Sequence, residues 1–227
     1  MIGRFRKLRH ANFFQEYSSI SYRASSSNRK FTFYNRFYLI FKRISDLCLA
    51  TIGLIISLPL LLLFSILIKL ETPGPAFFIQ ERVGLNGRYF NLYKLRSMGV
   101  DAEKNGAQWA TRNDPRVTKV GAFIRKTRID EIPQLFNVIK GDMSLIGPRP
   151  ERPVFTAKFS EEIPNFVERL NVPPGVTGWA QVNGGYDITP KEKLELDLYY
   201  INNRSILMDI KILFNTVVIV FTGHGAR

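Results

Sequence analysis

Residues 47–68 read LCLATIGLIISLPLLLLFSILI, a run of 22 residues without a charged side chain. At about 1.5 Å of rise per residue, a helix of this length matches the hydrocarbon core of a bilayer. Pro59 lies inside the run and lacks the N–H that an unbroken helix uses, so a kink is expected there. The run therefore predicts a membrane helix that bends near its middle.

Basic residues stand on both sides of this run, with Lys42 and Arg43 before it and Lys69 after it. A simple spanning helix would place one of these groups outside, against the tendency of Lys and Arg to remain cytoplasmic. A helix that enters, bends at Pro59 and returns keeps both groups inside, so we expect a re-entrant helix over residues 36–69. A single span, or a buried helix of a soluble protein, is the alternative.

The charge of the chain is concentrated near its start. Of a net charge of +13 over 227 residues, the first 45 residues contribute ten Lys or Arg against one acid, Glu16. Such a segment suits an anionic polymer or an anionic lipid surface, and composition does not choose between them. Residues 1–35 are also rich in serine, and we expect a basic flexible tail. The single cysteine, Cys48, excludes an internal disulfide.

A β-hairpin is predicted directly after the membrane run. Two aromatic-rich segments, AFFIQERV at 76–83 and RYFNLYKL at 88–95, flank the turn sequence GLNG. Alternation along the second segment places Lys94 at the end of an otherwise apolar face. A lysine there either has a function or extends its ammonium group past the apolar surface to water, and the pattern leaves both interpretations open.

The stretch RKTRIDEIPQLFNVIKGDMSLIGPRPER at 125–152 holds the candidate chemistry. Pro133 and Gly141 fit the first turn and the end of a short helix, which places Asp130 and Glu131 at or just before its N-terminus. Adjacent side chains splay apart, so one carboxylate can attack phosphorus while the other holds Mg²⁺.

Arg149 lies between two prolines, whose extended backbone would present it for bidentate phosphate binding. The alternative is structural: Asp130 and Glu131 would favour the helix start, and Arg149 would form a surface ion pair. Asp142 fits a turn residue, with a supporting role in the site left open.

The remaining segments predict short helices. Residues 154–170 are divided by Pro164, and residues 190–203 form a helix capped by Thr189. Residues 206–221 are too short for a span and favour a packed or interfacial helix. The predicted fold is α+β and mainly helical: a re-entrant membrane helix hairpin broken at Pro59, a small β-hairpin, and interfacial or amphipathic helices around a compact cytoplasmic domain over residues 70–227.

From about residue 36 to its end, the chain resembles the bacterial sugar transferase family, the monotopic polyprenyl-phosphate phosphoglycosyl transferases. Several long motifs carry the resemblance in the family's order. They are Lys42-Arg43 with Asp46, IKLETPGPAFFIQERVGLNGRYFNLYKLRSM at 68–98, RKTRIDEIPQLFNVIKGDMSLIGPRPE at 125–151, PGVTGWAQVNG at 174–184 and LELDLYYINNRS at 194–205.

The resemblance implies an enzyme that moves a sugar phosphate from a UDP-sugar to undecaprenyl phosphate at the cytoplasmic face of the bacterial inner membrane. UMP would be released, and a polysaccharide or glycoconjugate would be started. The family's covalent nucleophile matches Asp130, and its Mg²⁺ ligand matches Glu131. Arg149 matches the phosphate-binding arginine, while Lys94 and Arg96 match a basic pair near the site.

The resemblance also implies membrane lipids as partners, no nucleic acid, and a short form without the N-terminal spans of long members. One departure is Leu58, which separates Ser57 from Pro59, whereas the family often has serine directly before the proline. Two rival functions are a polyprenyl or lipid phosphatase and a membrane-tethered basic binding protein without enzymatic activity.

Overall fold

The computed structural model describes residues 33–104, 106, 108, 111, 114–184 and 188–222. This part of the chain is mainly helical, with two small two-stranded sheets. The helices are α2 (Phe33–Glu71), α3 (Lys119–Lys126), α4 (Gln134–Lys140), α5 (Pro153–Glu162), α6 (Trp179–Asn183), α7 (Pro190–Asn203) and α8 (Ile206–Thr222); the 3-10 helices are η1 (Leu85–Gly87), η2 (Ile129–Glu131) and η3 (Phe166–Asn171); the strands are β1 (Phe77–Val83), β2 (Tyr89–Leu95), β3 (Ser144–Ile146) and β4 (Gly175–Thr177).

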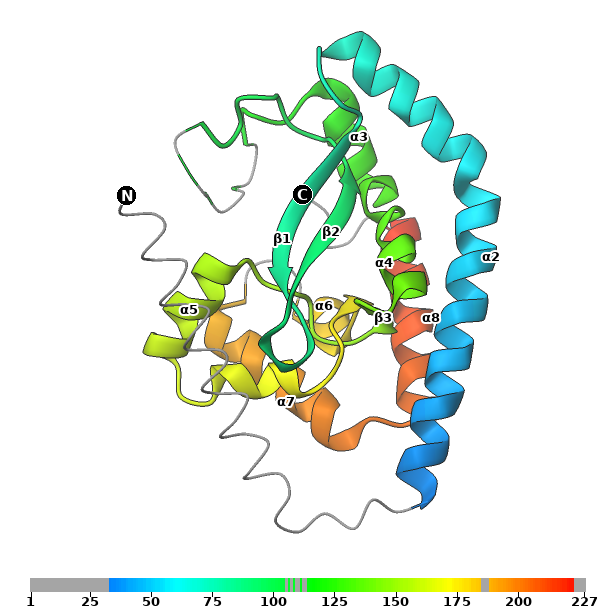
Figure 1. Ribbon diagram of the computed structural model, residues 1–227, viewed down its shortest axis with the longest axis vertical. Coiled ribbons are helices and arrows are strands. Elements are labelled where there is room, and N and C mark those ends of the chain that lie inside the picture. The colour runs from blue at the N-terminus through cyan, green and yellow to red at the C-terminus, as the bar shows by residue number, and fades with distance from the viewer. Residues whose placement is uncertain are drawn as a thin grey trace.

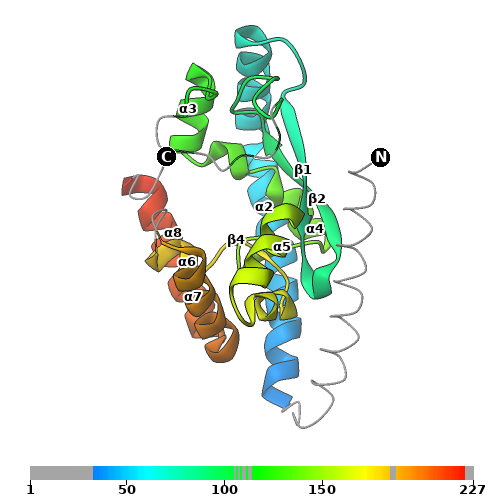
Figure 2. The same ribbon diagram turned by 90° about the vertical axis from the view of Figure 1, so that its left-hand side faces the viewer.

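The predicted mainly helical α+β fold is confirmed. The tail predicted for residues 1–35 lies outside the described residues except for its last three, which already belong to α2. Figure 2 shows α6, α7 and α8 grouped on one side of the molecule, with the β1–β2 hairpin on the other.

The long helix α2 carries the whole apolar run. Of the helices in the described residues, α2 alone is long and apolar enough to cross a membrane. It stays helical through Pro59, and Figure 1 shows it running along one edge of the molecule and curving in its second half. The hydroxyl of Ser57 donates to the carbonyl of Gly53 at 2.5 Å, so this serine bonds within the helix despite its displacement from the proline.

One face of α2 builds the core while the other is exposed. Leu61, Phe64 and Ile68 pack with Leu95 and Ile124 in a shared apolar cluster. The opposite face exposes a series of large apolar side chains, which are Ile52, Ile55, Ile56, Leu58, Leu62, Leu63 and Ile66. Both faces of α2 are therefore apolar, but only one is buried by the protein. This pattern indicates that the exposed face contacts lipid.

The predicted hairpin is confirmed. β1 and β2 pair antiparallel, with Phe77 opposite Leu95 and Val83 opposite Tyr89. The turn uses left-handed backbone at Asn86 and Gly87, with φ of 53° and 76°. Asparagine and glycine tolerate that conformation, which is why this turn sequence was informative.

Local signals also set the ends of α4 and α7. Pro133 caps α4, and Gly141 ends it with a left-handed φ of 94°. Thr189 and Glu192 form the capping box that begins α7. Pro164 separates α5 from η3, as expected from its missing N–H.

The sequence did not predict the parallel pair of β3 and β4. Ser144 lies opposite Gly175, and Ile146 lies opposite Thr177. A Cβ on Gly175 would stand 2.1 Å from the backbone nitrogen of Gly147, so the approach of these segments requires glycine. The pair holds the segment after β3, which contains Arg149, against the segment before β4.

Candidate active site

The two candidate carboxylates lie on η2, between α3 and α4. Arg128 precedes them in the left-handed region, with φ of 60°, and turns the chain sharply out of α3. Ile129 and Ile132 flank the pair and pack into the cluster formed by the second half of α2. The carboxylates are therefore anchored to the part of α2 that follows Pro59.

Glu131 is held by cations. The guanidinium of Arg149 donates to both carboxylate oxygens, at 3.1 and 2.5 Å. Lys94 Nζ lies 3.5 Å and Arg128 Nη1 3.8 Å from Oε1 of the same carboxylate. Burial alone would raise the pKa of Glu131, but Arg149 and Lys94 outweigh it and hold this pKa well below its usual range. Glu131 is consequently ionised at any physiological pH.

Asp130 has a different environment, although it is the adjacent residue. Its side chain is buried, and no cation in the described part of the chain lies within ion-pair distance of it. Burial raises the pKa of Asp130 to about 6; the charge of Lys94 opposes this rise and the charge of Glu131 adds to it. Near pH 7 the carboxylate is ionised but poorly solvated, which favours nucleophilic attack.

The structure brings together four of the five residues singled out from the sequence: Asp130, Glu131, Arg149 and Lys94. Lys94 does not extend to water. It turns inward, and burial lowers the pKa of its ammonium group while Glu131 opposes that effect.

Arg96 makes its contacts elsewhere. Its guanidinium donates to the carbonyl of Pro73 at 2.6 Å, and to the carbonyl and hydroxyl of Thr72 at 2.8 and 3.0 Å. These bonds satisfy backbone acceptors at and after the C-terminal end of α2, where an arginine is also favoured by the helix dipole. The contacts of Arg96 are therefore those of a residue that fixes α2 to the hairpin, and they do not place it beside Glu131.

Asp142 takes the position of a turn residue. Its N–H donates to the carbonyl of Asn137 at 3.0 Å, and its carboxylate pairs with Lys140 at 3.1 Å. The amide of Asn137 also donates to Asp142 at 3.2 Å and to the carbonyl of Asn91 at 2.7 Å. Through Asn137 this turn connects α4 with β2, the strand that carries Lys94.

Two arginines next to this cluster were missed by sequence reasoning. Arg82 on β1 and Arg169 on η3 both lie close to the segment that contains Arg149. The available signal was weak: Arg82 directly follows Glu81 and Arg169 directly follows Glu168, so neither stands out as an isolated charge in an apolar run, as Lys94 does.

The donor set has the character that Mg²⁺ requires, but it is incomplete by itself. Among the described residues, no three His, Cys, Asp or Glu side chains are grouped closely enough to hold a metal ion. The carboxylate of Glu131 fits Mg²⁺ because this ion takes one or two carboxylates and completes its shell with water and phosphate oxygens. The residues therefore fit Mg²⁺ together with a phosphate-bearing substrate.

Comparison with known proteins identifies the family. A family model described as bacterial sugar transferase matches residues 37–223, which include every residue of the cluster. The chain belongs to the bacterial sugar transferase family. The match begins within α2 and ends after α8, so it covers most of the long apolar helix as well as the residues of the cluster.

Three relatives illustrate the similarity. A Bacillus subtilis (strain 168) protein, named provisionally as an undecaprenyl-phosphate N-acetylgalactosaminyl 1-phosphate transferase, is 68% identical over 133 residues, covering 59% of this chain and 74% of its own length. The Aeromonas hydrophila UDP-N-acetylgalactosamine-undecaprenyl-phosphate N-acetylgalactosaminephosphotransferase is 50% identical over 84% of this chain. The Escherichia coli (strain K12) UDP-glucose:undecaprenyl-phosphate glucose-1-phosphate transferase is 41% identical over 82% of this chain. The matched regions cover only 46% and 41% of the last two proteins.

Proposed function

We propose that this protein transfers a sugar phosphate from a UDP-sugar to undecaprenyl phosphate and so starts the synthesis of a polysaccharide or glycoconjugate. The names of the relatives support the two substrates. The observation that carries the mechanism is the contrast between two adjacent carboxylates. Asp130 is buried without an ion pair among the described residues, while Glu131 is held by Arg149 and Lys94.

The contrast fits a two-step displacement. In the first step a carboxylate oxygen of Asp130 attacks the phosphorus that bears the sugar, the bond from that phosphorus to the bridging oxygen breaks, and UMP leaves. In the second step a phosphate oxygen of undecaprenyl phosphate attacks the same phosphorus. The bond to Asp130 breaks, the carboxylate is restored, and the product is an undecaprenyl diphosphate sugar.

The surrounding groups stabilise charge during both steps. Arg149 and Lys94 bind the diphosphate and oppose the negative charge that develops on the leaving group. Glu131 would hold Mg²⁺, which when bound supplies further positive charge beside the phosphates. Since Glu131 keeps its charge, it also orients Arg149 before substrate arrives.

Exposed apolar side chains on α2 and α8 support a position at the membrane. We propose that α2 is re-entrant, with both basic flanks on the cytoplasmic face of the inner membrane. Further large apolar side chains are exposed on α8, including Leu207, Ile210 and Phe214. Because Ile129 and Ile132 pack against α2, Asp130 would lie close to the headgroups, where the phosphate of a polyprenol resides.

The topology is tested with single cysteines in a Cys48→Ser background, at the exposed positions 36 and 104. A membrane-impermeant maleimide should label both cysteines from the same side of the inner membrane. Labelling from opposite sides would replace the re-entrant helix with a span.

The reaction is tested by incubating the protein with a panel of UDP-sugars, undecaprenyl phosphate and Mg²⁺. UMP release is expected in the complete mixture, and retention of ³²P from the donor's sugar-bearing phosphate on the protein is expected when undecaprenyl phosphate is left out. Asp130→Asn should abolish both, whereas Asp142→Asn, the same change in the turn after α4, should retain both. Release of inorganic phosphate instead of UMP would identify a phosphatase, and label retained by Asp130→Asn would refute the role of this residue as nucleophile.

A further inference from the structure

The backbone that carries Arg149 is held through its carbonyl oxygens. Pro148 and Pro150 have no N–H, so this segment can be fixed mainly by what its carbonyls accept. Four successive carbonyls each accept a bond from a different residue. Pro148 O accepts from Gly175 N at 2.9 Å, Arg149 O from Arg169 Nη2 at 2.8 Å, Pro150 O from Arg82 Nη1 at 2.9 Å, and Glu151 O from Val83 N at 3.0 Å.

Two of these four donors are side chains with charge, and both are fixed by acids. Arg169 is buried and donates to one carboxylate oxygen of Asp197 from Nε at 3.0 Å and from Nη2 at 2.7 Å. Its guanidinium also lies 5.1 Å from the ring centre of Phe166. Removing either member of such a pair leaves a buried charge, so the position of Arg169 is strongly determined.

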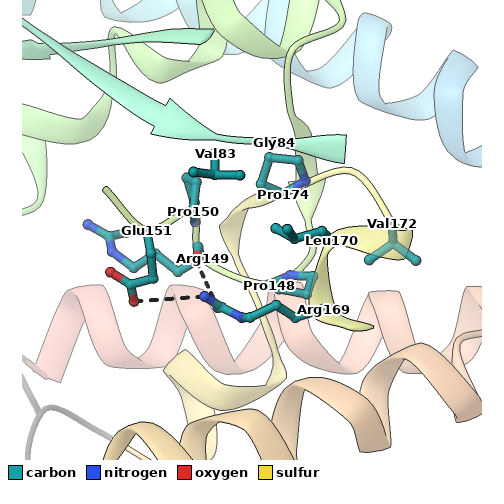
Figure 3. A pocket seen from close by; sticks show the side chains of 10 residues that line it. All are labelled: Val83, Gly84, Pro148, Arg149, Pro150, Glu151, Arg169, Leu170, Val172 and Pro174. Atoms are coloured by element: carbon teal, nitrogen blue, oxygen red, sulfur yellow. Dashed lines mark hydrogen bonds and ion pairs between the residues drawn. The ribbon is translucent and has the colours of Figure 1, made fainter. Parts of the chain in front are cut away.

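Glu151 links the two arginines. Its carboxylate lies 3.9 Å from Arg169 and 4.0 Å from Arg82, and it accepts a bond from Lys193. Figure 3 shows Glu151 beside Arg169, and the bond from Arg169 to the backbone of Arg149. Burial lowers the pKa of Arg82 to about 10, which leaves it charged and able to donate.

The space around these groups is too small for a substrate. The cavity bounded by Arg149, Glu151 and Arg169 has a volume of about 10 Å³, which accommodates roughly one water molecule. Arg169 therefore acts on neighbouring protein groups, and its bond to the Arg149 carbonyl is its nearest route to the candidate site.

We infer that Arg169 and Arg82 are positioning residues for Arg149: they hold its backbone so that its guanidinium reaches Glu131 and the donor diphosphate. Only the contact between Arg149 and the donor diphosphate rests on the proposed function. Arg82 and Arg169 would contribute to catalysis through Arg149, and Asp197 would contribute through Arg169.

The test uses Arg169→Lys, which keeps the charge but cannot bond Asp197 and the Arg149 carbonyl with the same planar group. Misplacement of Arg149 should lower kcat about 10- to 100-fold, with a smaller change in KM for the UDP-sugar. Arg88→Lys is the matched control, because Arg88 is exposed at the hairpin turn. Asp197→Asn is the second variant and should act in the same direction.

A double-mutant cycle separates positioning from general stability. If Arg169 acts through Arg149, then Arg149→Lys combined with Arg169→Lys should be no slower than Arg149→Lys alone. If the double variant instead loses kcat by the product of the two single losses, the two residues act independently and the inference is overturned.

A second measurement does not depend on turnover. The N–H groups of Val83 and Gly175 donate to this segment, so their hydrogen exchange should accelerate in Arg169→Lys and remain unchanged in Arg88→Lys. Unchanged protection at both amides would overturn the inference even if the wild-type protein proves inactive with UDP-sugars. Faster exchange without wild-type turnover would reject the proposed function and retain the positioning role.

Discussion

Asp130→Asn is expected to stabilise the protein while it abolishes transfer. Burial raises the pKa of Asp130 from 3.8 to about 6, so the folded protein binds this proton more tightly than the unfolded chain does. A difference of about two pKa units corresponds to roughly 3 kcal/mol, lost from the stability of the wild-type protein as pH rises from about 4 to above 6. A neutral amide of the same shape avoids that loss.

The assay is thermal unfolding in nanodiscs with EDTA present, at pH 7.5 and at pH 5. For a chain of this size, about 3 kcal/mol corresponds to a Tm increase of roughly 6–12 °C at pH 7.5. At pH 5 the gain should be about half as large, because the wild-type carboxylate is then mostly protonated in the folded state.

Asp142→Asn is the control, since it makes the same chemical change in a carboxylate that pairs with Lys140 and is partly exposed. It should leave Tm unchanged or slightly lower. An Asp130→Asn protein that is no more stable than wild type at pH 7.5, or equally stabilised at both pH values, would refute the argument from burial.

Three further outcomes are expected. Arg149→Lys should lower UMP release well below wild type, because an ammonium group cannot bond both oxygens of Glu131 or of a phosphate; unchanged kinetics would make Arg149 structural. Arg96→Gln should lower Tm through lost bonds at the end of α2 while kcat is retained; a loss of kcat at constant Tm would restore Arg96 to the substrate site. The profile of kcat/KM should rise with pH through about 6 as Asp130 ionises, and a flat profile between pH 5 and 8 would contradict this.

Much of the fold could be predicted because its signals are local. The turn at Asn86, the ends of α4 at Pro133 and Gly141, and the cap of α7 at Thr189 each depend on the chemistry of one or two residues. The pairing of β3 with β4 has no such local signal, because the partners lie about 30 residues apart and their contact depends on the absence of Cβ atoms.

The same distinction applies to the site. The sequence indicated Asp130, Glu131 and Arg149 separately, but not that Glu131 and Arg149 bond each other. Arg96 follows Lys94 by two residues, yet its acceptors are carbonyls at the end of α2, which only tertiary packing brings near. The alternative prediction was that Arg149 forms a surface ion pair. Arg149 does form an ion pair, with Glu131, but this pair lies within the cluster and not on the open surface.

The bond between Glu131 and Arg149 has a consequence for inhibitors. A compound that offers only an anion to Arg149 must separate the pair and leave the largely buried Glu131 without its main partner, a loss of roughly 3–5 kcal/mol for such pairs. Simple dianions should therefore be weak competitors, however well they resemble a diphosphate. A better inhibitor would offer an anion to Arg149 and, beside it, a cation to Glu131. A compound that chelates a divalent metal could supply that cation.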